Sequence, residues 1–337
     1  MAAEDGCARA AEAAAGTAAD CREIALLVNV ASGRGRARAI ADRLAAQCAR
    51  GGAPARIVEV GPGREVDLER ALAGCGVVII VGGDGTLHRA LPALRAVGAT
   101  VYHAPTGTEN LFAREFGMSV TAAGPAAGLG AAVRAIDLGE CDLGGGDVRL
   151  FALMVSIGFD AAVTHRLASR RTGPIRRLSY LRPIVAEAIL GRPPVLSLEI
   201  DGERILTRQR GLLVCANSRH YAVRLNPARD ARIDDGMLDF VFFPARGPVT
   251  LAAWAALARV RLHVGRPGVL YRQAKGAQVT VHEFGWGEAS GAPCPWLQLD
   301  GEPIEWRPEG PEAALEVRVL PRALKVAAGP MPAGVRA

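Results

Sequence analysis

Between Glu23 and Ile136, short runs of β-branched residues alternate with longer segments of helical period. The strand-like runs read IALLVNV, ARIVEV, VVIIVGG and TVYHAP, and the segments between them carry Ala, Leu and Arg at helical spacing. This alternation predicts an open parallel sheet with helices on both faces. Ligands of such sheets bind at the carboxyl ends of the strands, so this edge is where a site is expected.

The pattern changes near Gly144, after the stretch CDLGGGD. Most later runs are strand-like: VRLFALMVSIGFDAAV, VLSLEIDGERI, GLLVCANS, MLDFVFF, GAQVTVHEF and WLQLDGEPIEW. Only two helical stretches interrupt them, around Ser179 to Leu190 and Val249 to His263. Repeated short strands of this kind predict a mostly antiparallel β domain.

The chain is therefore expected to be an α/β + β protein of two domains. The first is a doubly wound parallel-sheet domain, and the second is mostly antiparallel and β-sandwich-like. We expect a disordered leader at 1–21, the first domain at 22–142, the second at 143–306, and a C-terminal segment at 307–337 that can return to the first domain.

Composition narrows the class of protein. The 337 residues are enough for two domains, and no apolar run approaches the roughly 18 to 20 residues of a membrane-spanning helix. Seven scattered cysteines without a C-x-x-C pair favour a reduced, cytoplasmic setting. The net charge of +6, nearly all from arginine, favours anionic partners such as phosphate, nucleic acid or an acidic membrane surface.

Three glycine-rich loops follow strands of the first domain: NVASGRGRA at 29–37, GGDGT at 82–86 and PTGTEN at 105–110. Backbone amides at helix N-termini bind anions, and glycine lets a phosphate approach closely. No Gly-Lys pair exists to complete a Walker A loop, and Arg38 stands where a dinucleotide fingerprint needs its third glycine. These loops indicate a phosphorylated ligand bound in another way.

Asp84 is an unexpected negative charge at the tip of the second loop. A divalent cation that neutralises nucleotide phosphates would explain it, because an acid in the loop can hold such a cation. The alternative is a cap for a helix beginning at Leu87.

The run VVIIVGGDGTLHRAL resembles the signature of the diacylglycerol kinase catalytic-domain superfamily, which includes bacterial soluble lipid kinases and sphingosine kinases. Further similar motifs follow in the family's order: NVASGRGRA before it, then APTGTENLFAREFG, SIGFDAAV, NPARDARIDDGMLDFVFF, YRQAKGAQVTV and LDGE. The resemblance covers the chain from about Ile24 to Val326. It implies an α/β domain that binds nucleotide, a β-rich domain that binds the lipid substrate, and an active site in the cleft between them. It also implies a requirement for ATP and Mg²⁺.

By the same resemblance, the nucleotide site is formed by Asn29, Ser32, Gly33, Gly82, Gly83, Asp84, Gly85, Thr86 and Thr108. The metal would be held by Asp84 and, in the second domain, by the Asp235 carboxylate with the backbone carbonyls of Arg232 and Met237. Oxygen ligands from a tight loop suit a hard cation, although solvated acids in a turn are the alternative. The chain departs from the family pattern at Val30, His88, Arg89, Glu109 and Leu111.

Two Asp-Gly-Glu tripeptides occur, at Asp201 and at Asp300. If WLQLDGEPIEW is one strand, alternation places Asp300 and Glu302 on the same face, as suits general-base catalysis. The alternative is a β-turn, which we expect for the copy at Asp201. Sequence reasoning alone does not separate the copies, but the resemblance assigns the catalytic base to Glu302, with Asp300 beside it.

We therefore expect an ATP-dependent lipid kinase that transfers the γ-phosphate to a lipid hydroxyl, most simply that of a diacylglycerol. The alternatives are an NAD kinase-like enzyme, a sphingoid-base kinase, or a catalytically impaired lipid- or nucleotide-binding protein. Expected partners are the lipid and a transient membrane surface, with no nucleic acid, and a homodimer is left open. The protein would be cytoplasmic and peripheral, docking through SRRTGPIRR at 169–177 or EFGWGEASGAPCPW at 283–296.

Overall fold

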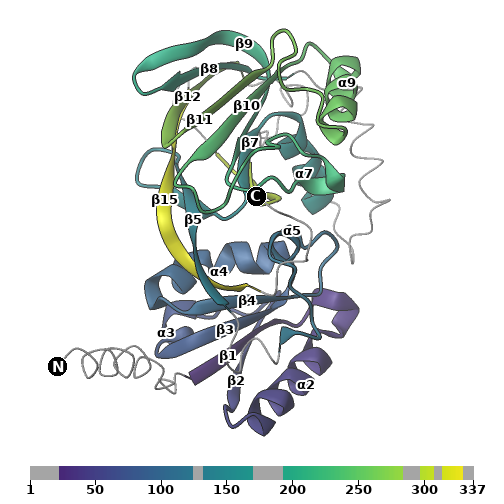
Figure 1. Ribbon diagram of the computed structural model, residues 1–337, viewed down its shortest axis with the longest axis vertical. Helices are drawn as coiled ribbons and strands as arrows, with labels where there is room; N and C mark the ends of the chain where they lie inside the picture. The colour runs from purple at the N-terminus through teal and green to yellow at the C-terminus, as the bar shows by residue number, and fades with distance from the viewer. Residues whose placement is uncertain (1–22, 124–131, 170–192, 284–296, 307–312, 329–337) are drawn as a thin grey trace, which may run out of the picture.

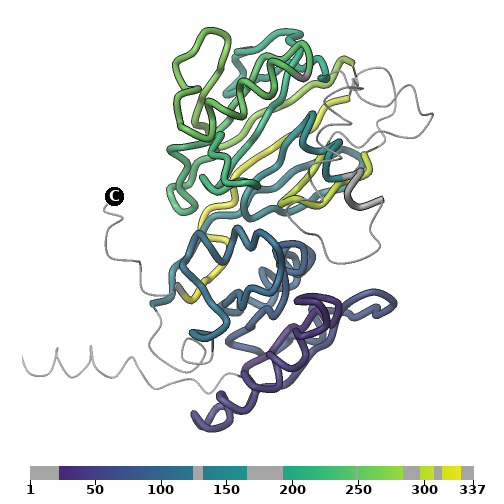
Figure 2. The backbone as a smooth tube through the Cα atoms, turned by 90° about the vertical axis from the view of Figure 1, so that its right-hand side faces the viewer, coloured from purple at the N-terminus to yellow at the C-terminus, as the bar shows by residue number. Residues whose placement is uncertain are grey.

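The computed structural model describes residues 23–123, 132–169, 193–283, 297–306 and 313–328. An α/β domain forms the lower half of the molecule in Figure 1 and a β domain the upper half, and Figure 2 shows the same two lobes from the side. The predicted fold class is thus confirmed. The predicted leader and the helical stretch at 179–190 lie outside the described residues.

The first domain is a parallel sheet of four strands in the order β2-β1-β3-β4. Its strands are β1 (Glu23–Asn29), β2 (Ala55–Val60), β3 (Cys75–Gly82) and β4 (Thr100–Pro105). Helix α2 (Ala37–Arg50) lies on one face, and α3 (Leu68–Leu72) and α4 (Asp84–Val97) lie on the other (Figure 1). All four strands point the same way, so the loops after them meet at one edge.

Local sequence explains these elements. The central strand β3 is apolar along most of its length because both faces of a parallel sheet are covered by helices. Helix α2 buries one stripe, Ala37, Ala41, Leu44 and Cys48, against the sheet. Its outward positions include charged residues of both signs, such as Arg38 and Asp42, as expected for a helix that faces water.

The second domain is mostly antiparallel, with strand order β14-β13-β7-β9-β8-β12 and β10 pairing with both β9 and β11. Its strands are β6 (Val148–Phe151), β7 (Met154–Ile157), β8 (Val195–Ile200), β9 (Glu203–Ala216), β10 (Leu238–Pro244), β11 (Leu270–Ala274), β12 (Gly276–Glu283), β13 (Leu297–Leu299) and β14 (Glu302–Ile304). Their inward side chains form a second core that includes Phe151, Phe240 and Phe242.

Two long strands join the domains. β15 (Ala313–Ala328) pairs antiparallel with β12 through its first half and parallel with β4 near its end, while β5 (Ala132–Asp142) runs antiparallel along it. Figure 1 shows β15 as the yellow strand that runs from the upper lobe to the lower. The sequence analysis did not identify β5, because AVRAIDLGECD carries charges and a glycine instead of an apolar run.

Short helical elements complete the structure: η2 (Ser32–Gly35), α5 (Leu111–Glu115), α7 (Phe159–Ser169), η4 (Ala222–Arg224) and α9 (Pro248–Arg259). Helix α9 matches the second predicted helical stretch, and it lies on the outside of the β domain (Figure 1). In the part of the chain that the structure describes, no helix is long and apolar enough to cross a membrane.

Candidate active site

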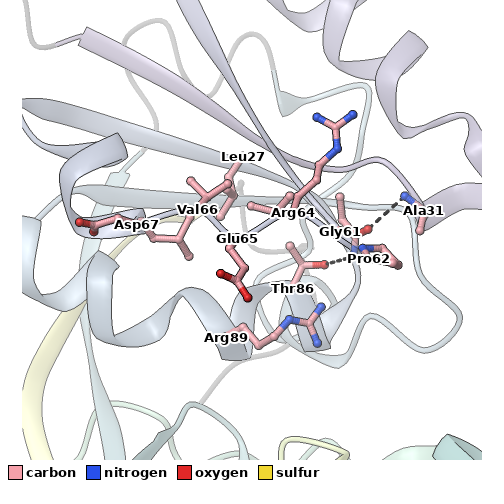
Figure 3. A pocket seen from close by; sticks show the side chains of 13 residues that line it. Leu27, Ala31, Gly61, Pro62, Arg64, Glu65, Val66, Asp67, Thr86 and Arg89 are labelled. Atoms are coloured by element: carbon pink, nitrogen blue, oxygen red, sulfur yellow. Dashed lines mark hydrogen bonds between the residues drawn. The ribbon is translucent and has the colours of Figure 1, made fainter.

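A cavity of about 920 Å³ opens at the carboxyl ends of β1 and β2, beside the first turns of α4 (Figure 3). Asn29 and Thr86 line it, and the Asn29 Nδ2 donates a hydrogen bond to the Thr86 Oγ1 at 3.0 Å. The rest of the lining is Leu27, Ala31, Val60, Gly61, Pro62, Arg64, Glu65, Val66, Asp67, Leu68 and Arg89. The sequence analysis missed the β2–α3 loop in this lining, although its position after a parallel strand could have indicated it.

The three glycine-rich loops meet at this edge as predicted. The Ser32 and Thr106 hydroxyls lie 2.7 Å apart, and the Thr106 amide donates to the Gly82 carbonyl at 2.8 Å. A Cβ on Gly33, which has a φ of +61°, would lie 3.3 Å from the Thr106 Cβ. Thr108 is exposed on the same β4–α5 loop. The loops therefore form one polar surface beside the cavity.

Asp84 connects the second loop to the third. Its two carboxylate oxygens accept hydrogen bonds from the backbone amides of Leu111, at 2.9 Å, and Phe112, at 3.1 Å, at the start of α5. The expected helix start at Leu87 is wrong: α4 begins at Asp84, with Gly83 at its N-cap. Asp84 thus caps a neighbouring helix and not its own, because its side chain points across to the β4–α5 loop.

Burial governs the titration of this region. It raises the pKa of Asp84 and lowers the pKa of His103, although each group's charge opposes the shift of the other. The His103 Nε2 lies 3.0 Å from the Gly82 carbonyl oxygen, as a neutral imidazole that donates there would. A carboxylate oxygen has lone pairs beyond those used here, so Asp84 still fits a cation or its water ligands.

The predicted strand through Asp300 and Glu302 is wrong. Asp300 and Gly301 form a two-residue turn between β13 and β14, with φ values of +52° and +85°. Positive φ at both positions is the type I′ geometry, for which Asp-Gly is a preferred sequence. The two acids are therefore not alternate residues of one strand; Asp300 is in the turn and Glu302 begins the returning strand.

The Asp300 carboxylate is buried and serves as an anchor. It accepts hydrogen bonds from the backbone amides of Ala152 (2.8 Å), Leu153 (2.8 Å) and Met154 (3.0 Å). Its Oδ2 also lies 3.2 Å from the His88 Nδ1, on the second turn of α4. Asp300 thus fixes the β13–β14 hairpin between the two domains.

Glu302 lies directly over the start of α4. A Cβ added to Gly85 would lie only 1.8 Å from the Glu302 Oε1, so glycine is required for this approach. The Arg89 guanidinium, which also lines the 920 Å³ cavity, is 3.7 Å from the same oxygen. The structure therefore brings the GGDGT loop and the later Asp-Gly-Glu together, although they are far apart in sequence. Two departures from the family pattern, His88 and Arg89, contact these acids.

A second, apolar cavity of about 240 Å³ borders the hairpin at Gly301. Leu111 and Gly301 line it next to the acids, and Met154, Val214 and Phe243 line it from the sheet. The remaining lining is Phe159, Asp160, Val163, Thr164, Leu212, Tyr221, Ala222, Val223, Leu225, Pro227, Leu251, Ala252, Trp254, Ala255, Ala258 and Gln298. The sequence analysis did not predict this cavity, because its walls come from elements spread over the whole second domain.

A network of polar side chains lies in this apolar wall. Asp160 accepts hydrogen bonds from the Ser156 and Tyr221 hydroxyls and from the Ala161 amide, and burial raises its pKa. Gln298 Nε2 donates to the Ser156 Oγ at 2.6 Å, and its Oε1 accepts from the Gly301 amide. The network ties the cavity wall to the turn that carries Glu302.

Asp235 lies in the loop before β10, away from the hairpin, with Arg232 and Met237 flanking it. Its Oδ1 accepts from the Met237 amide at 3.1 Å, and burial together with Asp137 and Asp234 raises its pKa. These three carboxylates line a cavity of about 500 Å³. Within the described ranges, no group of three or more His, Cys, Asp and Glu side chains is arranged as a metal site, so a cation at Asp235 would need backbone carbonyls as well.

Comparison with protein families identifies both halves of the chain. Residues 23–141 match the diacylglycerol kinase catalytic domain, and residues 153–328 match the YegS C-terminal NAD kinase beta sandwich-like domain. The chain belongs to the YegS-like lipid kinase family. The predicted family is thus confirmed, and members of this family are lipid kinases that use ATP.

Individual relatives agree with this family assignment. A diacylglycerol kinase of Mycobacterium tuberculosis is 30% identical over 224 residues, which cover 64% of this chain and 72% of that protein. A protein of Pseudomonas aeruginosa named as a YegS-like lipid kinase is 30% identical over 277 residues, or 80% of this chain and 82% of that one. The enzyme is therefore a lipid kinase, homologous to diacylglycerol kinases.

Solved structures show the same fold. A diacylglycerol kinase from Bacillus anthracis superposes with a TM-score of 0.62 at 15% identity, covering 92% of this kinase and 97% of that chain. A second structure from the same organism reaches a TM-score of 0.69 at 17% identity, covering 92% and 96%. At these identities the match concerns the fold alone.

Proposed function

We propose that this lipid kinase phosphorylates the free hydroxyl of a diacylglycerol, with ATP bound in the 920 Å³ cavity and the acyl part in the apolar one. The observation that carries the proposal is the position of Glu302. Its carboxylate lies against Gly85 of the GGDGT loop and 3.7 Å from Arg89, which lines the larger cavity, and the neighbouring Gly301 lines the apolar one. A hydroxyl and a γ-phosphate that enter from the two sides would meet at this point.

In the proposed reaction, Glu302 accepts the proton of the lipid hydroxyl as its oxygen attacks the γ-phosphorus. The new P–O bond forms as the bond to the β-phosphate oxygen breaks, and ADP leaves with the electron pair. Asp300 positions the hairpin and does not take the proton, because its oxygens already accept three backbone amides. Arg89, between the cavity and Glu302, is placed to balance charge on the transferred group.

The residues present fit Mg²⁺, which neutralises phosphate charge in kinases. Asp84 offers carboxylate oxygens at the phosphate edge, and Asp235 offers one beside two further acids, of which Asp234 is paired with Arg134. Burial first, and then the charges of Asp137 and Asp234, raise the pKa of Asp235, and a cation bound among these carboxylates would offset both effects.

The test of the proposed function is a labelled-ATP assay against dispersed short-chain diacylglycerol, a sphingoid base, ceramide and NAD. We expect Mg²⁺-dependent label in the diacylglycerol product. Label in NAD or in the sphingoid base would replace the proposed acceptor, and no label in any acceptor would indicate a binding protein without turnover.

The role of Asp84 has its own test. Asp84→Asn keeps only one side-chain oxygen for the two α5 amides. We therefore expect the free energy of unfolding to fall by about 1 kcal/mol or more, and the melting temperature to fall with it. If the carboxylate also serves the cation, the Mg²⁺ concentration for half-maximal rate rises as well. A lower melting temperature with unchanged Mg²⁺ dependence would make Asp84 a structural residue only.

A further inference from the structure

The outer surface around α9 exposes an unusual amount of apolar side chain. The large hydrophobic residues exposed in the described ranges are Val133, Val148, Val223, Val249, Val260 and Leu262. Val223 belongs to η4, and the last three lie on α9 or directly after it, with 79% of Val249, 59% of Val260 and 56% of Leu262 accessible. Scattered exposed valines need no explanation, but a group of them around one helix does.

Helix α9 differs from the surface helix α2. The exposed positions of α9 are Val249, Thr250, Ala252, Ala253, Ala256 and Arg259, whereas α2 exposes Arg38, Asp42, Arg43, Gln47 and Arg50 together with alanines. The inner side of α9 is apolar too, because Leu251 and Ala258 are buried. A helix that is apolar on both sides is suited to an environment other than water on its outer side.

The same surface is basic. From Phe240 to His282 the sequence contains no Asp or Glu. Exposed arginines surround the apolar positions: Arg224, Arg246, Arg259, Arg261 and Arg266. Asp230, an exposed acid nearby, is paired with Arg229. Exposed apolar side chains among arginines, with few acidic side chains nearby, are complementary to a lipid bilayer with anionic headgroups and an apolar interior.

This surface is continuous with the apolar cavity. Ala252 is exposed and also lines the cavity, and so does Val223 of η4. The Arg259 guanidinium donates to the Val223 carbonyl at 2.9 Å, so η4 and the end of α9 form one unit. An apolar molecule that enters the cavity between these elements would pass the exposed positions first.

We propose that α9 and its flanking residues, from Val223 and Arg224 to Arg266, form the surface that docks on an anionic lipid bilayer, so that a lipid passes from the bilayer into the cavity. This surface is distinct from the two segments that the sequence suggested, which lie mostly outside the described residues. The transfer of lipid into the cavity rests on the proposed function. Binding to the bilayer does not, because it is measured without catalysis.

The test is sedimentation of the full chain, without ATP, with vesicles of phosphatidylcholine containing about one third phosphatidylglycerol. The triple variant Val249→Ser, Val260→Ser and Leu262→Ser should lower the bound fraction at least about tenfold. The double variant Arg246→Gln and Arg266→Gln should lower binding to these vesicles roughly tenfold and leave binding to pure phosphatidylcholine nearly unchanged. All five side chains are exposed, so both variants should fold, as their melting temperatures will show.

Matched controls are Val148→Ser, at an exposed valine elsewhere, and Arg43→Gln with Arg50→Gln on α2; these should bind vesicles like wild type. Phosphorylation of dispersed short-chain diacylglycerol should be unchanged in the triple variant, because none of its three positions lines the cavity.

Equal vesicle binding by the triple variant and wild type would overturn the proposal. Loss of duplex DNA binding, and not of vesicle binding, in the arginine variant would also overturn it. A failed kinase assay with normal docking would overturn the proposed substrate instead.

Discussion

The two Asp-Gly-Glu hairpins have the same sequence and nearly the same backbone, yet only one contributes to the candidate site. Asp201-Gly202 turns between β8 and β9 with φ values of +52° and +78°, and Asp300-Gly301 turns between β13 and β14 with +52° and +85°. In both, the glutamate pairs with the residue before the aspartate. Local sequence therefore determines the turn in both cases.

The difference lies in what each turn packs against. All three residues of the first copy are exposed, whereas Asp300 is 6% exposed and holds three backbone amides. Glu302 contacts the start of α4, and Glu203 lies at an open hairpin end. The same tripeptide thus reaches the candidate site only where the second domain contacts the first.

The largest contrast is expected between the two glutamates. Glu302→Gln keeps the size of the side chain but removes the proton acceptor, so kcat should fall about 10²-fold or more with little change in ATP affinity. Glu203→Gln should leave kcat unchanged. The measurement is turnover of dispersed diacylglycerol at saturating ATP, and wild-type turnover in Glu302→Gln would remove that residue from the mechanism.

The two aspartates should differ in stability. In Asp300→Asn the amide nitrogen faces a backbone N–H in either orientation, that of Ala152 in one and those of Leu153 and Met154 in the other. At least one buried donor therefore loses its acceptor, and the free energy of unfolding should fall by about 2 kcal/mol. Asp201→Asn should change it by no more than a few tenths, since Asn-Gly also favours the type I′ turn. Denaturant unfolding of both variants compares them directly, and equal losses would mean that burial is not what separates the copies.

The contact between the hairpin and α4 can be tested at Gly85. Gly85→Ala puts a Cβ where the Glu302 carboxylate lies, and displacing that carboxylate should lower kcat roughly tenfold. Stability should change little, because alanine is a good helix former. In a Glu302→Gln background the alanine should have no further effect on kcat, and full additivity of the two changes would show that Gly85 acts in another way.

The smallest expected effect is that of removing both acids of the exposed copy. Asp201→Asn with Glu203→Gln should keep activity within about twofold of wild type, because neither side chain contacts the site. If the folded double variant lost activity, the chemistry would belong to the hairpin at Asp201 and not to the one at Asp300. Kinase assay and melting temperature together check it.

Sequence reasoning predicted the parallel sheet because apolar runs such as VVIIVGG repeat at regular spacing and are set by local burial. It also predicted that the three glycine-rich loops share one edge, which follows from parallel strands. It placed Asp300 in a strand, although the Asp-Gly pair is a local signal for the turn that the structure shows. What has no local signal is the burial of this turn against the first domain. The contact of Glu302 with Gly85 and the apolar cavity depend on long-range packing, which periodicity does not report.

The role of Asp84 shows the same limit in one side chain. The local sequence suggested a cap for its own helix or a metal ligand. The structure shows instead that the Asp84 carboxylate accepts hydrogen bonds from two backbone amides of α5, which the local sequence does not indicate. The resemblance places Arg89 along the nucleotide site and also marks it as a departure from the family pattern, but it gives no sign of the contact with Glu302.

The strand β15 also constrains how the protein is made. It ends near the C-terminus of the chain but supplies the neighbour of β4 in the first domain, and β5 pairs along most of its length. During synthesis, the edge of β4 must therefore stay unpaired until residues 313–328 have left the ribosome. The first four strands are made long before their sheet gains its last neighbour, so this edge is exposed to wrong pairing in the interval.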